Sequence, residues 1–111
     1  MTIQQNNLRL YRKQSKLTQS DIAYIMALAD YSNISHWELG HKMPNVDILL
    51  MYHLLFDIPT ESFFERQKQE LKEKIRERIK QLIEQLKSGI SDAKVAMRVA
   101  FLESAFTRLS A

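Results

Sequence analysis

Apolar residues recur at intervals of three and four along most of the chain, which is the spacing of one face of an α-helix. Short polar breaks interrupt this pattern, and most of them contain a residue of the kind that caps a helix. The pattern predicts five helices in residues 1–64 and two in residues 65–111. The expected caps are Asn7, Thr18, Asp30, Asn45 and Thr60 for the first five helices, and Ser91 or Asp92 for the last.

Residues 30–45, DYSNISHWELGHKMPN, place two apolar side chains among many short polar ones. Ile34 and Trp37 lie three positions apart, so they share one helix face and are expected to pack into a core. Gly40 is expected to end this helix just after Leu39, because glycine readily adopts the left-handed backbone of a helix end. The opposite, polar face of the helix is then left open to contact another molecule.

The segment VDILLMYHLLF, residues 46–56, is apolar at almost every position. Such a segment is expected to be largely buried, since exposing it to water would be unfavourable. Met51, Tyr52 and His53 within it are therefore interpreted as core residues and not as functional ones.

Beyond Phe64 the chain mixes charges of both signs with a sparse apolar stripe, as expected for a solvated helix over about 65–88. A break at KSGIS, which contains Gly89, is followed by a second striped segment. Two such segments joined by a turn predict an antiparallel helical hairpin. The stripes expected to face each other are Leu71, Ile75, Ile79, Leu82 and Leu86 on the first helix, and Val95, Val99, Leu102, Phe106 and Leu109 on the second.

The composition favours an all-α fold. The 111 residues include only two glycines and two prolines, and 45% are hydrophobic, so a folded core is expected. No apolar run has the roughly eighteen residues that a membrane-spanning helix needs. Cysteine is absent, so disulfide and thiolate chemistry are excluded and a reducing cytoplasm is the expected location.

The net charge of +3 is unevenly distributed. Residues 1–64 carry five Lys and Arg against six acids, a net of −1, whereas residues 65–111 carry a net of +4. Yet the first twenty residues contain four bases and no acid. This balance permits binding to nucleic acid but does not require it.

The stretch LTQSDIAYIM…NISHWELGHKMPNVDILLMYHLLFDIPTESFF resembles the Cro/repressor (XRE-type) helix-turn-helix family over about residues 7–64. The resemblance lies in Thr18-Gln19, Ile22-Ala23, Ile34-Ser35, Glu38, Gly40, Pro44 and the closing FDIPTESFF. It implies a five-helix, lambda-repressor-like domain that binds duplex DNA, usually as a dimer on a palindromic operator. A helix at about 30–39 would then lie in the major groove, which admits one α-helix.

The resemblance also implies roles for individual residues. Gln19 would grip phosphate and support base contacts, residues of the recognition helix would reach base edges, and residues of the following loop would hold the DNA backbone. Glu38 would be a structural acid tied to the backbone or to a base of the first helix. The implied DNA-binding residues are Gln19, Tyr31, Ser32, Asn33, His36, Lys42 and Asn45.

The chain departs from the family pattern at several positions. Ala27 stands in the turn where the family commonly has glycine, and the turn is one residue longer than the commonest form. His36 and His41 stand where arginine is frequent, so two weaker cations replace two strong ones. These departures bear on the affinity for DNA and on the operator more than on the fold.

No pattern typical of an enzyme, a metal site or a cofactor site is found in the sequence. His36 and His41 are five positions apart, which is the wrong spacing for one helical face, and no glycine-rich phosphate loop is present. Three readings follow: a transcriptional regulator, most simply a repressor, that forms a homodimer through residues 65–111; an antitoxin whose hairpin binds a protein partner; or an adaptor without a DNA role.

Overall fold

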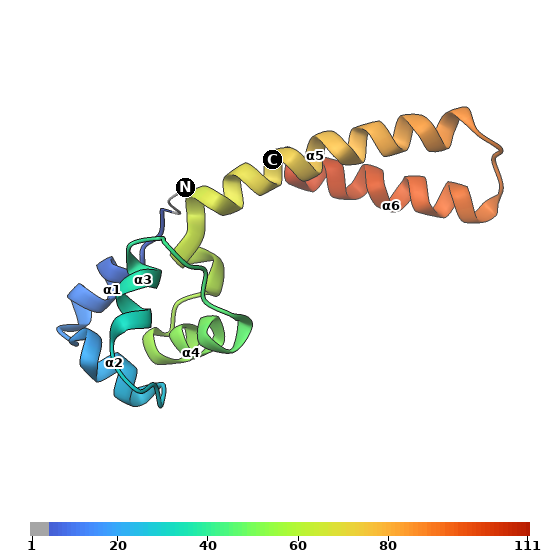
Figure 1. Ribbon diagram of the computed structural model, residues 1–111. Coiled ribbons are helices and arrows are strands. Elements are labelled where there is room, and N and C mark those ends of the chain that lie inside the picture. Colours follow the sequence, from blue (N-terminus) through green and yellow to red (C-terminus); the bar gives the residue numbers. More distant parts are fainter. Residues whose placement is uncertain (1–4) are drawn as a thin grey trace. The chain divides into compact units, whose positions relative to one another are not determined.

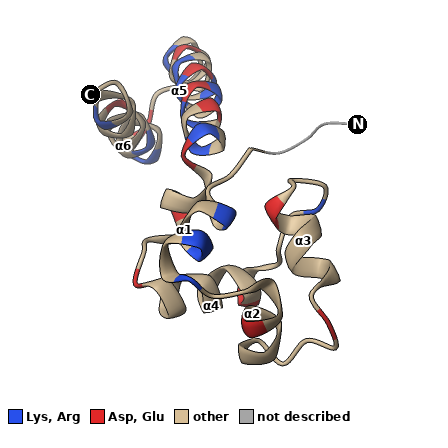
Figure 2. Cartoon of the chain, turned by 90° about the vertical axis from the view of Figure 1, so that its left-hand side faces the viewer, with Lys and Arg blue, Asp and Glu red and all other residues tan. Residues whose placement is uncertain are grey.

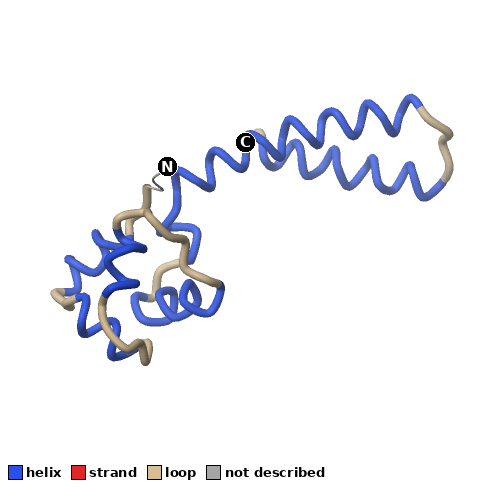
Figure 3. The backbone as a smooth tube through the Cα atoms, viewed as in Figure 1, coloured by secondary structure: helices blue, strands red, loops and turns tan. Residues whose placement is uncertain are grey.

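The computed structural model describes residues 5–111, and every regular element in that range is helical (Figures 1 and 3). This confirms the predicted all-α class. Residues 1–4, which belong to the predicted domain 1–64, lie outside the described residues. The elements are α1 (Leu8–Ser15), α2 (Gln19–Ile25), α3 (Ser32–Glu38), α4 (Val46–Phe56), the 3-10 helix η1 (Thr60–Phe64), α5 (Glu65–Ser88) and α6 (Ala93–Leu109).

The chain divides into two compact units, one up to Lys68 and the other from Gln69 to Ala111. The first unit has a core to which α1, α2, α3, α4 and η1 all contribute. Ile34 and Trp37 are part of this core, as the sequence predicted. The buried members are Leu8, Ile22, Ala23, Met26, Ile34, Trp37, Ile48, Tyr52, Phe63 and Phe64.

Several helix starts follow the predicted caps. Thr18 and Asp21 form a capping box at the start of α2, in which each side chain accepts a hydrogen bond from the other residue's backbone N–H. The Asn45 and Asp92 side chains accept hydrogen bonds from Ile48 N and Val95 N at the starts of α4 and α6. These local signals are sufficient because a cap satisfies backbone donors of its own helix.

Two expected caps are corrected by the structure, and a third has the predicted position but makes no capping hydrogen bond. Asn7 holds the N-cap position of α1, but its side chain donates to Ser62 O instead of bonding to the helix. Tyr31, and not Asp30, is the N-cap of α3. Thr60 lies inside η1, whose N-cap is Pro59, so the expected fifth helix of the first unit is a short 3-10 helix.

The burial expected for residues 46–56 is only partly correct. Ile48 and Tyr52 are buried and His53 is half-buried, with Nδ1 2.7 Å from Ile58 O. The other side of α4 is exposed because a single helix of this small unit reaches the core with one face only. The apolar residues on that exposed side, Met51 among them, are Val46, Leu50, Met51 and Leu54.

The second unit is a hairpin in which α5 and α6 lie side by side and antiparallel (Figure 1). The whole predicted stripe of α6 is half-buried. On α5, however, Leu71, Ile75 and Leu82 are exposed, contrary to the expectation. The apolar residues of α5 that are half-buried, which we call its seam, are Ile79, Ile83 and Leu86.

Three non-glycine residues among those described have a left-handed backbone: Lys16 at φ 67°, Ala27 at φ 57° and Asp57 at φ 55°. Lys16 and Asp57 are the C-caps of α1 and α4. Gly40 follows α3 with φ 78°, which confirms its predicted role as a helix stop. Only the glycine adopts this conformation without a steric cost to a Cβ atom.

Candidate nucleic-acid interface

An open groove of about 740 Å³ lies between α1, the start of α2 and α3. Basic residues of α1 and of its C-cap form one side. Tyr31, Ser35 and Leu39 form the side contributed by α3 and its two caps. Gln19 and Ser20, at the first turn of α2, also line the groove. The groove therefore brings positively charged groups from one helix close to polar groups from two others.

A buried ion pair connects the helices on either side of the groove. Arg12 Nε donates to Glu38 Oε2 at 2.6 Å and Arg12 Nη2 donates to Glu38 Oε1 at 2.9 Å. The two side chains are only 10% and 3% exposed. Arg12 Nη1 also donates to Leu17 O at 3.2 Å, so the guanidinium is bonded on several sides. The hydrogen bond to Glu38 raises the pKa of Arg12 above its ordinary value.

Gln19 belongs to the same network. Its Nε2 donates to Glu38 Oε1 at 3.1 Å, which fixes the amide at the start of α2. Glu38 was expected to be tied either to the backbone or to a base of the first helix, and the structure shows the second alternative with Arg12 as the base. Arg12 is thereby occupied within the protein, and it contributes less to the attraction of anions than its charge alone suggests.

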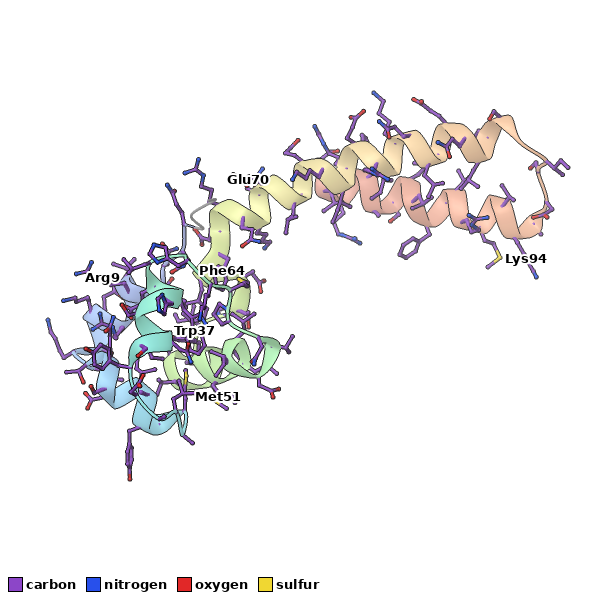
Figure 4. The ribbon with its side chains drawn as sticks, in the orientation of Figure 1. Arg9, Trp37, Met51, Phe64, Glu70 and Lys94 are labelled. Atoms are coloured by element: carbon purple, nitrogen blue, oxygen red, sulfur yellow. The ribbon has the colours of Figure 1, made fainter. Side chains whose placement is uncertain are left out.

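The remaining bases of this region are available to the solvent. Arg9, Lys13 and Lys16 are exposed, line the groove and make no ion pair within residues 5–111. Figure 2 shows basic positions on α1, and Figure 4 shows Arg9 at the edge of the unit with Trp37 in its interior. The residue roles implied by the resemblance did not include these cations. The excess of bases over acids in the first twenty residues was the signal that could have found them.

The residues expected at the start of the recognition helix fall into two groups. Tyr31 lines the groove together with Ser35, which is not among the DNA-binding residues that the resemblance implies. Ser32 and Asn33 are exposed but do not line the groove. Since successive helix residues are rotated by about 100°, these neighbouring side chains cannot all point the same way.

Ser32 is also bonded locally. Its backbone N and its Oγ both donate to Asp30 Oδ1, at 2.8 and 2.6 Å. These two hydrogen bonds lower the pKa of Asp30 below its ordinary value. The carboxylate thus orders the entry to α3, although Asp30 is one residue too early to be its N-cap. The Ser32 hydroxyl keeps its acceptor capacity for a contact from outside.

His36 is half-buried, and its ring lies 6.1 Å from that of His41, centroid to centroid. Nδ1 of His36 is buried and has no hydrogen-bond partner among residues 5–111. A contact from this ring to an external group would therefore have to use Nε2. His36 is placed less openly than Ser32 and Asn33, which are exposed.

Lys42 and Asn45 flank Pro44 in the loop after α3, and both are exposed. Lys42 makes no ion pair within the described part of the chain. Asn45 Oδ1 is engaged as the cap of α4. Of the two loop residues, Lys42 is therefore the better placed for an anion, and Asn45 has a clear structural task.

The connection between α2 and α3 contains the departure from the family pattern noted above. Ala27 N donates to Tyr24 O at 3.1 Å and Leu28 N donates to Ala23 O at 2.8 Å, which closes the end of α2. This closure requires the left-handed conformation of Ala27. Glycine is the usual residue at such a position because it has no Cβ atom and adopts a positive φ without a clash. In this chain an alanine adopts the left-handed conformation instead.

No protein-family model matches the chain, and searches of curated proteins and of solved structures found no match either. The resemblance to the XRE-type family therefore rests on the residues quoted above. None of the helices in residues 5–111 combines the length and apolar character that crossing a membrane requires. Within the same range, no three His, Cys, Asp or Glu side chains are grouped as metal ligands would be.

Proposed function

We propose that the chain is a duplex DNA-binding regulator of transcription of the XRE type, acting in the cytoplasm as a repressor. In this proposal α2 and α3 form the helix-turn-helix, and α3 enters the major groove. The chain acts by binding and has no catalytic role. The proposal is supported by one relationship above all: α3 is held by buried Ile34 and Trp37, while its leading end borders a groove lined by free cations.

The charges support a division of labour between the residues. Arg9, Lys13, Lys16 and Lys42 are suited to phosphates, because exposed cations release counterions when they bind DNA. Tyr31, Ser32, Asn33, Ser35 and His36 are the polar groups near the tip of α3 that are suited to base edges. Gln19 is positioned by Glu38 to support them.

The test is duplex binding at two salt concentrations, with sequences selected from a random duplex pool. Replacing Arg9, Lys13 and Lys16 by Gln should weaken all duplexes alike. It should also reduce the slope of log affinity against log salt, by roughly 0.9 for each phosphate that the variant no longer neutralises. The matched control replaces Lys80, Lys94 and Arg98 of the hairpin by Gln, which removes the same charge elsewhere. No binding at low salt, or equal slopes for the two triple variants, would refute the proposal.

The homodimeric repressor and the antitoxin-like alternative differ in the molecule that binds the hairpin. In the first it is a second copy of the chain, and in the second it is another protein. Among residues 69–111 only Ala105 is buried, so this unit leaves apolar surface for a partner in either case. Homodimerisation through the hairpin stays a prediction, which sedimentation of the full chain tests. An adaptor without a DNA role is the reading that remains if the salt-dependent binding fails.

A further inference from the structure

Apart from Ile90 in the turn, the large exposed apolar residues of the hairpin lie on one of its two broad faces or at the edge of that face. On α5 they are Leu71, Ile75 and Leu82, which are rotated on average about 70° from the seam formed by Ile79, Ile83 and Leu86. Ile75, Ile79 and Leu82 line an open groove of about 480 Å³ along this side. The exposed side of α5 is therefore shaped to receive side chains.

The helix α6 adds a second apolar row. Phe101 is 70% exposed and Met97 is 73% exposed, four positions apart. Both are rotated away from the half-buried stripe of α6 in the same sense in which Leu71, Ile75 and Leu82 are rotated away from the seam of α5. In two antiparallel right-handed helices, this places the α5 row and Phe101 on the same broad face, with Met97 at its outer edge. We call this surface the apolar face of the hairpin.

The charged residues on the apolar face are all positive. Lys74 and Arg78 line the α5 groove, and its lining contains no acid. By the same helical rotation, Arg98 lies beside Phe101, Lys94 lies about two turns before Phe101 on the same side of the helix, and Arg108 lies at the edge. All five are exposed and none makes an ion pair within residues 5–111.

The acids of the hairpin lie on its other face or at its ends. Glu73 pairs with Arg76 at 3.1 Å, and Glu103, the single acid of α6, pairs with Lys87 at 3.2 Å. Glu77 and Glu84 are rotated to the same side as Glu73. Asp92 is in the turn, where it caps α6. Along both helices, the apolar residues and the cations beside them therefore lie on one face, and the acids lie elsewhere.

We propose that the apolar face binds an acidic amphipathic helix of another protein. Two antiparallel helices present a shallow trough in which a third helix packs, and apolar residues of that helix would fill the groove around Ile75 and Leu82. Its carboxylates would meet Lys74, Arg78 and the cations of α6. Because α6 has 17 residues, a helix of about the same length would cover the face.

A second copy of the chain fits this face less well. Placing two such faces together would bring Lys74, Arg78, Lys94 and Arg98 of one copy against the same cations of the other, and like charges in a contact are unfavourable. Duplex DNA would match the cations but would leave Phe101 without an apolar partner. A bilayer with anionic headgroups offers both apolar and negatively charged groups, and the test below includes it as a separate outcome. The inference does not depend on the proposed binding of DNA by the first unit, but it assigns this face of the hairpin to another protein in place of a second copy of the chain.

The test uses the full chain and two synthetic peptides of 21 residues, labelled for fluorescence anisotropy at physiological salt. One peptide has Leu at heptad positions a and d and mainly Glu elsewhere, and its twin has Lys in place of Glu. The chain should bind the Glu peptide at least tenfold more tightly than the Lys peptide. Arg78→Glu should weaken the Glu peptide about tenfold, and Phe101→Ser should weaken it as well.

Lys80→Glu is the matched control, because Lys80 is exposed, lies two residues from Arg78 and is rotated to the other face. It should leave the preference unchanged, and circular dichroism should show the same helix content in all variants. Equal binding of the two peptides, or binding of neither, would overturn the proposal. Tighter binding to phosphatidylserine vesicles or to duplex DNA than to the Glu peptide would also overturn it, if Arg78→Glu abolished that binding. A tight homodimer in sedimentation that Phe101→Ser dissociates would overturn it too.

Discussion

Arg12 and Glu38 form a two-pronged ion pair that joins α1 to α3, with N–O distances of 2.6 and 2.9 Å. Both side chains are nearly inaccessible to water. The pair lies below the groove and also receives the amide of Gln19. The orientation of α3 against α1 therefore depends on two charges that stabilise each other in a poorly solvated place.

Removing one partner of this pair should be costly. Arg12→Met or Glu38→Gln is expected to lower the free energy of unfolding by about 3 kcal/mol, because the remaining group is left buried without its partner. Urea denaturation measures the change. The double variant should lose clearly less than the sum of the two single losses. Additive losses would mean that the two residues do not stabilise the fold as a pair.

Replacing Ala27, whose backbone is in the left-handed conformation, with glycine should stabilise the fold. Ala27→Gly is expected to raise the free energy of unfolding by about 1 kcal/mol, because glycine adopts a positive φ without a clash at Cβ. Thermal and urea unfolding measure the gain. Ala29→Gly is the control in the same connection, since Ala29 does not have a positive φ. If both substitutions destabilised the chain equally, the backbone at Ala27 would not be strained.

The raised pKa of Tyr52 should make the stability of the fold depend on pH in the alkaline range. Burial, together with the charge of Glu38, raises its pKa above the ordinary value, so the folded chain holds this proton to higher pH than the unfolded chain. The stabilisation is fully present below about pH 10 and is lost as the pH rises beyond it. Tyr52→Phe should reduce this loss, as urea unfolding between pH 8 and pH 11 would show.

The same substitution should also act at neutral pH. The Tyr52 hydroxyl is buried and has no hydrogen-bond partner among residues 5–111. Removing it is expected to raise the free energy of unfolding by about 1 kcal/mol, since a buried hydroxyl without a partner is unfavourable. Tyr24→Phe, at a residue that is 87% exposed, is the control and should change little. A clear loss of stability in Tyr52→Phe would reveal a hydrogen bond at that hydroxyl.

Binding experiments should distinguish residues that contact bases from residues that contact phosphates. His36→Ala is expected to relax the sequence preference at one position by about 1–3 kcal/mol, and Lys42→Ala to weaken all duplexes similarly. Selection from a random duplex pool measures the first effect, and affinity at two salt concentrations measures the second. Ser32→Ala should also relax preference, but the effect of removing its bond to Asp30 has to be checked by circular dichroism. An unchanged preference in both His36→Ala and Ser32→Ala would refute the placement of α3.

Features that depend on neighbours in the sequence were predicted well. The caps Thr18, Asn45 and Asp92 follow from side chains that satisfy backbone groups within three residues. Gly40 ends α3 for the same kind of local reason. Thr60 was a wrong prediction because the chain after Pro59 forms a tight 3-10 turn, for which Thr60 is not the cap.

Features that depend on packing were not accessible from the pattern. The apolar residues of α5 cover a wide arc, so the sequence could not tell that Ile83 faces α6 while Ile75 and Leu82 stay exposed. It could not tell which base of the first helix Glu38 would select. Once Arg12 is taken, Arg9, Lys13 and Lys16 remain for the groove, a division that only the three-dimensional arrangement reveals.

Because few side chains in residues 69–111 are buried, this unit should be the part of the chain that is most sensitive to proteases. Opening a region that hides little apolar surface costs little free energy, so protease cleavage and amide hydrogen exchange should both be fastest in this unit. A trypsin digest would trim it first and leave the more protected unit ending near Lys68. Any molecule that covers the hairpin would slow this trimming, and the lifetime of the chain would then report whether its partner is present.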